Sequence, residues 1–168
     1  MHIARILRNN RISFSFEFFP PRSEAASEKL FSSIADLAAL APAYISVTYG
    51  AGGSTRELTH NLVLRIQRET GLTVVSHLTC VGATREEIRR ILDRYRENGI
   101  CNIMALRGDP PEGVSGFRQT EGGFRYAAEL VSFIRENYPG MGIGVAGYPE
   151  GHPETPNRLT EIEHLKQK

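Results

Sequence analysis

Residues 12–19 read Ile-Ser-Phe-Ser-Phe-Glu-Phe-Phe and are followed at once by Pro20-Pro21. Apolar and polar side chains alternate along this run, which is the period-two pattern of a β-strand with two unlike faces. The prolines end the strand, because proline has no amide hydrogen to donate to a neighbouring strand. We therefore predict a first strand at residues 12–19, with Ser13, Ser15 and Glu17 on one face.

Similar short runs recur along the chain, and helical patterns separate them. We predict further strands at residues 44–49, 73–80, 102–106 and 143–147. We predict helices at residues 23–40, from about 55 to 71, from 84 to 99, at 124–137 and from about 156 onward. The clearest helix start is Thr84 with Glu87 three residues later, a capping-box pattern. The predicted buried face of that helix consists of Ile88, Ile91, Leu92 and Tyr95.

Strands that alternate with helices predict a parallel sheet joined by crossover helices. Two architectures suit this pattern: an open doubly wound sheet and a (β/α)8 barrel. No Gly-x-Gly-x-x-Gly follows the first strand, so the dinucleotide-binding signature is absent. Polar residues gather instead at the C-terminal ends of several strands, which is the active-site face of a barrel.

We therefore expect an α/β fold of the (β/α)8 TIM-barrel type, incomplete, with about five β/α units in a single domain over residues 1–168. A whole barrel needs about 200 residues or more. We accordingly expect a truncated product or a fragment whose first and last strands are unpaired edges.

The composition limits the classes of binding partner that the chain is expected to have. The chain has 168 residues, 23% of them charged, and a formal net charge of +1. This balance argues against nucleic acid or an acidic membrane as a partner, and residues 1–11 lack the apolar run of a signal peptide. Cys80 and Cys101 fit neither a disulfide framework nor a zinc spacing, so we expect two reduced core thiols in a cytoplasmic protein with no metal site.

Glu17 and Asp109 are the acidic candidates for chemistry. Glu17 is expected to point into the barrel mouth among phenylalanines, where poor solvation raises a carboxyl pKa and suits it to proton donation. The alternative is a carboxylate paired with an arginine such as Arg22. Asp109 follows Arg107 and Gly108 after the fourth strand and is expected across the mouth from Glu17. The alternative there is a solvated turn residue, and Gly108 is expected to let the backbone approach a ligand.

Other polar and aromatic residues stand at strand and helix ends. Thr48 shares parity with Ser46 and should face inward, although a threonine that caps its own loop is the commoner use of such a residue. His77 shares parity with Val75 and Thr79, and a satisfied core histidine is a commoner use of such a residue than a ligand. Tyr148 could stack on a flat ring, and His152 could meet a phosphate. Tyr126-Ala127 opens a helix whose first turn offers free N–H groups to an anion, or is simply an amphipathic helix start.

Five of these segments together resemble the methylenetetrahydrofolate reductase family. They are residues 15–22 (SFEFFPPR), 46–51 (SVTYGA), 77–80 (HLTC), 105–109 (ALRGD) and 148–154 (YPEGHPE). Their order and spacing match over nearly the whole chain. The resemblance implies a (β/α)8 barrel that binds FAD, takes electrons from NADH or NADPH, and reduces 5,10-methylenetetrahydrofolate to 5-methyltetrahydrofolate. A homo-oligomer is expected for the complete protein.

The resemblance also implies roles for individual residues. Glu17 resembles the general acid that opens the five-membered ring of the substrate, and Asp109 the carboxylate that stabilises the resulting positive charge beside the flavin. With Thr48, which also lies where nicotinamide approaches, these residues are expected to bind the substrate. The expected flavin contacts are Thr48, Tyr49, Ala51, His77, Arg107, Gly108, Asp109, Tyr126, Ala127, Tyr148, His152 and Lys168.

Two departures from the family pattern keep an alternative open. The later strands of the family, with a glutamine and a phenylalanine that hold folate and nicotinamide, have no counterpart here. Glu161 stands where the family usually has aspartate near the FAD adenosine. A truncated, non-catalytic FAD- or folate-binding fragment is therefore the alternative function, and a remnant without any ligand is a third.

Overall fold

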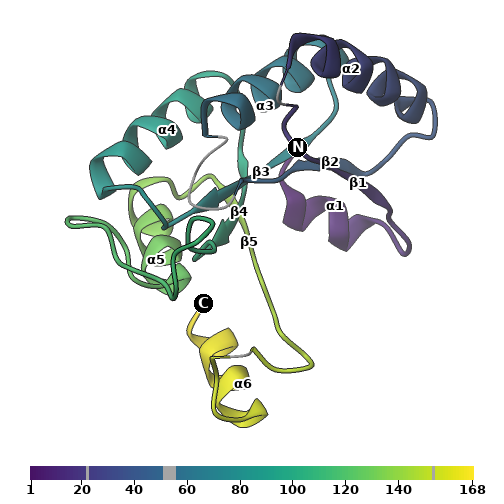
Figure 1. Cartoon of the computed structure of the whole chain (residues 1–168). Coiled ribbons are helices and arrows are strands. Elements are labelled where there is room, and N and C mark those ends of the chain that lie inside the picture. The colour runs from purple at the N-terminus through teal and green to yellow at the C-terminus, as the bar shows by residue number, and fades with distance from the viewer. Residues whose placement is uncertain (22, 51–55, 153) are drawn as a thin grey trace.

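The computed structural model describes residues 1–21, 23–50, 56–152 and 154–168 (Figure 1). The strands are β1 (Ser15–Phe18), β2 (Tyr44–Val47), β3 (Val74–Thr79), β4 (Asn102–Leu106) and β5 (Gly142–Val145). The helices are α1 (Ile3–Asn9), α2 (Glu24–Ala38), α3 (Arg56–Thr70), α4 (Arg85–Glu97), α5 (Ala127–Asn137) and α6 (Arg158–Gln167). The predicted alternation of strands and helices is confirmed.

The order of the strands decides between the two expected architectures. All neighbouring strands are parallel, and their order in the sheet is β1-β2-β3-β4-β5, the same as in the chain. A doubly wound sheet reverses its strand order at a switch point, whereas successive units of a barrel add each new strand on the same side. The described strands therefore form the partial barrel that was predicted.

The two faces of the sheet differ sharply. One face carries a core cluster that joins the strands to α2, α3, α4 and α5; its fully buried strand residues are Ile45, Val47, Leu78, Ile103 and Ala105. In Figure 1, α2, α3 and α4 lie along the same side of the strands. Residues of the opposite parity face the other way, and the register pairs Glu17 with Ser46 and His77 with Met104. We call this second face the inner face of the sheet.

Helix α4 forms where the local signals are strongest. The Thr84 hydroxyl accepts the Glu87 amide at 3.2 Å, and the Glu87 carboxylate accepts the Thr84 amide at 2.7 Å, which completes the predicted capping box. All the residues of its predicted apolar face are buried. A helix that is amphipathic and capped in this way needs little help from distant residues to begin at the right place.

Helix α1 was not predicted. A seven-residue helix is too short to be stable alone, and α1 is held by β4: the Ile3 amide donates to Asn102 Oδ1 at 2.7 Å, and Asn102 Nδ2 donates to the Met1 carbonyl at 2.8 Å. It also lies against Gly142 in β5, where an added Cβ would come within 3.0 Å of Ile3. Helix α1 therefore covers the N-terminal ends of β4 and β5, away from the predicted site.

Several predicted boundaries are corrected. Strand β1 begins at Ser15 rather than residue 12, and Ile12 is 85% exposed, so little of its side chain is buried against the described residues. Helix α5 begins at Ala127 rather than 124, because Phe124 is buried in the preceding loop. Cys80 is buried as expected, but Cys101 is partly exposed and is not a core thiol. No described helix is both long and apolar enough to cross a membrane.

Candidate functional site

Glu17 is the centre of a three-strand contact on the inner face. The Ser46 hydroxyl donates to Glu17 Oε2 at 3.1 Å, and His77 Nε2 lies 3.2 Å from the same oxygen. The three residues come from β1, β2 and β3, and strand parity places them on one face. The structure thus brings together two of the candidate residues, Glu17 and His77. It adds Ser46, which could have been found from its shared parity with Thr48 and its place opposite β1.

The expected poor solvation of Glu17 is wrong for the described chain. The Glu17 side chain is 52% exposed. Strand alternation directs Phe16 and Phe18 to the opposite face, where Phe18 packs against the core cluster, and Phe19 is 75% exposed. Neighbours in sequence therefore do not cover the carboxylate. Arg22, the alternative partner for Glu17, lies outside the described residues.

His77 is the buried member of this contact. Its side chain is only 12% exposed. Burial lowers the pKa of the imidazole, and the negative charge of Glu17 opposes that effect only in part. His77 is therefore neutral at neutral pH, and it meets Glu17 as a polar ring rather than as a cation.

The turn after β4 carries Arg107, Gly108 and Asp109. Because the strands are parallel, Asp109 lies beyond the same end of the sheet that Glu17 approaches, and it is exposed. Gly108 has φ +85°, and a Cβ there would lie 2.6 Å from Val81 Cγ1 and 2.8 Å from Thr79 Cβ. The packing of this turn against the end of β3 thus requires glycine, a reason that the sequence did not reveal.

Arg107 is paired with Glu154. Its guanidinium nitrogens lie 2.6 and 3.0 Å from the two carboxylate oxygens, and its guanidinium lies 5.1 Å from the centre of the Phe117 ring. Hydrogen bonding within this pair raises the pKa of Arg107 and lowers that of Glu154. The pair joins the segment after β4 to the segment after β5, although sequence spacing did not identify Glu154 as a partner.

The predicted residues after β5 form one cluster. The Tyr148 and His152 rings meet edge to face with centres 4.7 Å apart. Lys168 Nζ lies 5.9 Å from the centre of the Tyr148 ring and donates to the Ala146 carbonyl at 3.2 Å. An aromatic ring, an imidazole and a primary amine therefore lie close together after β5.

The residues after the end of β2 and in the first turns of α3 are more buried than Glu17 and Asp109. Thr48 is buried, and its carbonyl accepts the Thr59 hydroxyl at 3.0 Å. Tyr49 meets the buried His60 ring edge to face at 5.8 Å, and burial raises the pKa of Tyr49 to about 12. Tyr49 is therefore a neutral phenol at any pH near neutrality. Ala51 lies outside the described residues.

The remaining predicted residues lie on α5 and α6. Tyr126 is the N-cap of α5 and is 49% exposed, and Ala127 is the first helical residue, so they open this helix as predicted. Glu161 in α6 is buried and accepts the Thr155 hydroxyl at 2.7 Å. Glu161 therefore holds its own loop, whatever else it contacts.

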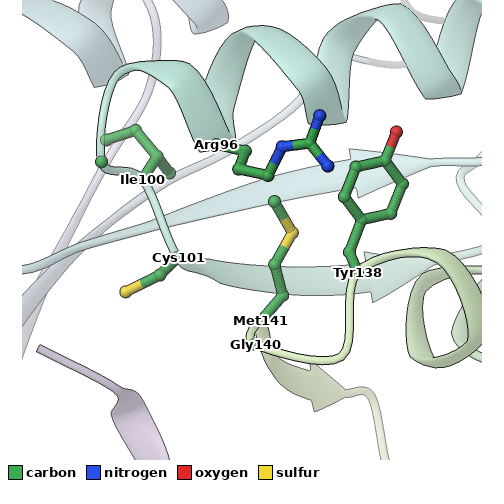
Figure 2. Close-up of a pocket in the computed structure, with 7 residues that line it drawn as sticks. Arg96, Ile100, Cys101, Tyr138, Gly140 and Met141 are labelled. Carbon is green, nitrogen blue, oxygen red and sulfur yellow. The ribbon is translucent and has the colours of Figure 1, made fainter.

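A hollow elsewhere in the fold is a poor candidate for the site. Figure 2 shows it between α4 and the starts of β4 and β5, lined by Arg96, Ile100, Cys101, Tyr138, Gly140 and Met141. Its volume of about 160 Å³ is small beside the roughly 300 Å³ or more of typical ligand pockets. It also lies at the N-terminal end of the strands, opposite Glu17. Across the described ranges, no group of three or more His, Cys, Asp or Glu residues is placed to hold a metal ion.

Comparison with known proteins identifies the family. The family model for methylenetetrahydrofolate reductase matches residues 2–168. The chain belongs to the methylenetetrahydrofolate reductase family. This agrees with the barrel topology and with the segments quoted from the sequence, whose described residues reach or follow the C-terminal ends of the five parallel strands.

Members of the methylenetetrahydrofolate reductase family from bacteria and plants are similar over nearly all of this chain. It is 46% identical to a 5,10-methylenetetrahydrofolate reductase of Pectobacterium carotovorum over 94% of the chain and 51% of that protein. It is 43% identical to the Escherichia coli protein of the same name over 94% of the chain and 51% of that protein. For methylenetetrahydrofolate reductase (NADH) 1 of Arabidopsis thaliana, the identity is 44% over 99% of the chain and 30% of the relative. The chain thus spans about half the length of the bacterial relatives and less than a third of the plant one.

Proposed function

We propose that this chain carries the acid and flavin-facing part of a methylenetetrahydrofolate reductase, which reduces 5,10-methylenetetrahydrofolate to 5-methyltetrahydrofolate with FAD and with NADH or NADPH as the electron donor. One observation supports this most directly: Glu17, His77, Asp109 and the cluster around Tyr148 all lie at the C-terminal end of one parallel sheet. That is the end at which barrel enzymes place their active sites.

The chemistry of the residues fits FAD. Arg107 and Lys168 supply cations for a diphosphate, Tyr148 supplies an exposed aromatic face, and the first turn of α5 at Ala127 supplies free N–H groups. We propose that these residues, with Thr48, Tyr49, Ala51, His77, Gly108, Asp109, Tyr126 and His152, hold the cofactor. When bound, FAD supplies the hydride that the folate receives.

The chain itself supplies acid and electrostatic chemistry in this proposal. Glu17 holds the proton that opens the five-membered ring of the folate, and its partly open position on the inner face leaves room for a substrate. The Asp109 carboxylate stabilises positive charge that develops next to it. Thr48, at the end of β2, lies where the nicotinamide or the folate approaches.

The partners and the location follow from the same proposal. The net charge of +1 supports a small-molecule folate substrate rather than nucleic acid. The free cysteines support a reducing compartment, and we propose the cytoplasm. We also propose that the complete protein is a homo-oligomer.

A visible spectrum of the purified chain with added FAD tests the function. Bound flavin that bleaches with NADH or NADPH and recovers with 5,10-methylenetetrahydrofolate supports the reductase. The chain spans only about half or less of the length of these relatives, and this favours one alternative function, a non-catalytic FAD- or folate-binding fragment. Flavin that binds but stays oxidised would point to this fragment. A chain that binds neither FAD nor folate would overturn both proposals.

The role of Glu17 has its own test. We expect Glu17→Gln to keep the bleaching of flavin by NADH and to lose the recovery with folate, because the amide has no acidic proton to donate. The matched control is Glu24→Gln in the first turn of α2, which should keep both steps. Unchanged folate reduction in Glu17→Gln would remove Glu17 from the acid role.

A further inference from the structure

The two oxygens of the Glu17 carboxylate have different surroundings. Ser46 Oγ and His77 Nε2 both approach Oε2, at 3.1 and 3.2 Å. Among the described residues, Oε1 has no hydrogen-bond or ion-pair partner. The side chain is half exposed as a whole, so the protein holds one oxygen and leaves the other open on the inner face.

This asymmetry decides where a proton resides in the acid form. The Ser46 hydroxyl donates to Oε2. His77 Nε2 is buried, has no other hydrogen-bond partner among the described residues and lies 3.2 Å from the same oxygen, so an Nε2–H of the neutral imidazole has Oε2 as its nearest acceptor. An oxygen whose lone pairs accept such bonds is a worse site for a proton than its free partner, because protonation there would break them. The proton of a neutral Glu17 is therefore expected on Oε1.

We propose that Ser46 and His77 are positioning residues that hold Oε2 of Glu17, so that Oε1 is the oxygen that carries the proton toward the ligand. This inference rests on the proposed acid role of Glu17. It assigns a task to Ser46, and a second task to His77 beside its proposed contact with the flavin.

The sheet keeps both positioning residues in place. Ser46 is buried and lies directly opposite Glu17 in the register of β1 and β2. The His77 carbonyl accepts the Ser76 hydroxyl at 3.2 Å, and Ser76 Oγ lies 2.7 Å from the Tyr95 hydroxyl in α4. The backbone that carries His77 is thus tied to the helix layer behind the sheet, which limits the movement of the imidazole.

The first test follows the titration of Glu17 by NMR in the chain labelled with ¹³C at glutamate side-chain carboxyls, and Glu17→Gln identifies the signal. Loss of a hydrogen bond to the carboxylate disfavours its charged form, so Ser46→Ala and His77→Leu, which both remove the donor, should each raise the midpoint by about half a unit to one unit. Ser15→Ala is the matched serine control on the same face of β1, and His164→Leu is the matched histidine control on α6. Both controls should leave the midpoint unchanged.

The outcomes separate this inference from the proposed function. Midpoints that rise in Ser46→Ala and His77→Leu, and return to the original value in Ser46→Thr, support the positioning role even if the chain reduces no folate. Unchanged midpoints in both variants overturn it, whatever the flavin does. In an FAD-loaded chain that reduces folate, both variants should lower the rate of folate reduction.

Discussion

Arg107 and Glu154 form a two-point ion pair, with Nη1–Oε2 at 2.6 Å and Nη2–Oε1 at 3.0 Å, between the segment after β4 and the segment after β5. A fork-to-fork geometry of this kind is the strongest arrangement that an arginine and a carboxylate adopt. The guanidinium that we propose for the FAD diphosphate is therefore already occupied by a carboxylate. A diphosphate has to compete with Glu154 for the same donors.

We expect Glu154→Gln to tighten FAD binding. The amide keeps the size of the side chain but removes the competing charge, and Glu154 is 56% exposed, so the effect should be modest. A pair at this exposure is worth about 1 kcal/mol, which corresponds to roughly a fivefold lower dissociation constant. A flavin fluorescence titration measures the dissociation constant for FAD in the variant and in the unchanged chain. Glu150→Gln is the control, because Glu150 is 92% exposed and its contact with Arg158, at 3.8 Å, is long. Weaker FAD binding in Glu154→Gln would contradict the prediction.

Gly108→Ala should destabilise the fold more than a glycine substitution with the same backbone conformation elsewhere. Gly108 and Gly113 have φ +85° and +80°, but only Gly108 has neighbours within 4 Å of an added Cβ. We expect about 1 kcal/mol for Gly113→Ala, from the left-handed conformation alone, and about 1–3 kcal/mol more for Gly108→Ala, from the clash with Val81 and Thr79. Urea denaturation of both variants checks the difference; equal losses would show that the turn relaxes without cost.

Tyr95→Phe should lower stability without changing the packing of α4. The Tyr95 hydroxyl is shared between His60 Nδ1 at 2.5 Å and Ser76 Oγ at 2.7 Å, and all three residues are buried. Removing the Tyr95 hydroxyl leaves His60 Nδ1 and Ser76 Oγ without this hydrogen-bond partner, at a cost of about 1–3 kcal/mol for each buried atom. Tyr138→Phe is the control: its hydroxyl also has two partners, but Arg89 and Asp93 lie on a more open part of α4. A loss in Tyr95→Phe no larger than in Tyr138→Phe would contradict the prediction.

The buried His60 should make the fold less stable in mild acid. Burial lowers the pKa of His60 from 6.5 to about 4, so between these values the unfolded chain binds a proton that the folded chain rejects. The free energy of unfolding should therefore fall as the pH drops from 6.5 to 4, by about 3 kcal/mol from this group, and this contribution should be constant above pH 6.5. His77, whose pKa is also lowered, adds to the fall in the same direction.

Urea denaturation at several pH values measures this loss. His60→Gln removes the titration and keeps a group that can hydrogen-bond to Tyr95, so its stability should vary less between pH 6.5 and 4 than that of the unchanged chain. His164→Gln in α6 should keep the original dependence. The same pH dependence in His60→Gln and in the unchanged chain would exclude His60 as its cause.

Patterns that depend on close neighbours in the chain were predictable. The bounds of β4 and the cap of α4 at Thr84 and Glu87 agree with the structure, because alternation and capping involve residues only a few positions apart. Strand parity also placed Glu17 on the inward face of the first strand, since successive side chains of a strand must point to opposite sides. The sequence alone therefore determined the class of fold and the end of the sheet at which the candidate residues gather.

Contacts between distant residues were decided only in the folded chain. Helix α1 exists because Asn102, about a hundred positions later, binds its first turn, and Glu17 is open because Phe16 and Phe18 turn away and no described residue covers it. Glu154 reaches Arg107 across 47 positions. No periodicity encodes such pairings: they depend on the order of strands in the sheet and the paths of the connecting segments, which packing of the whole chain sets.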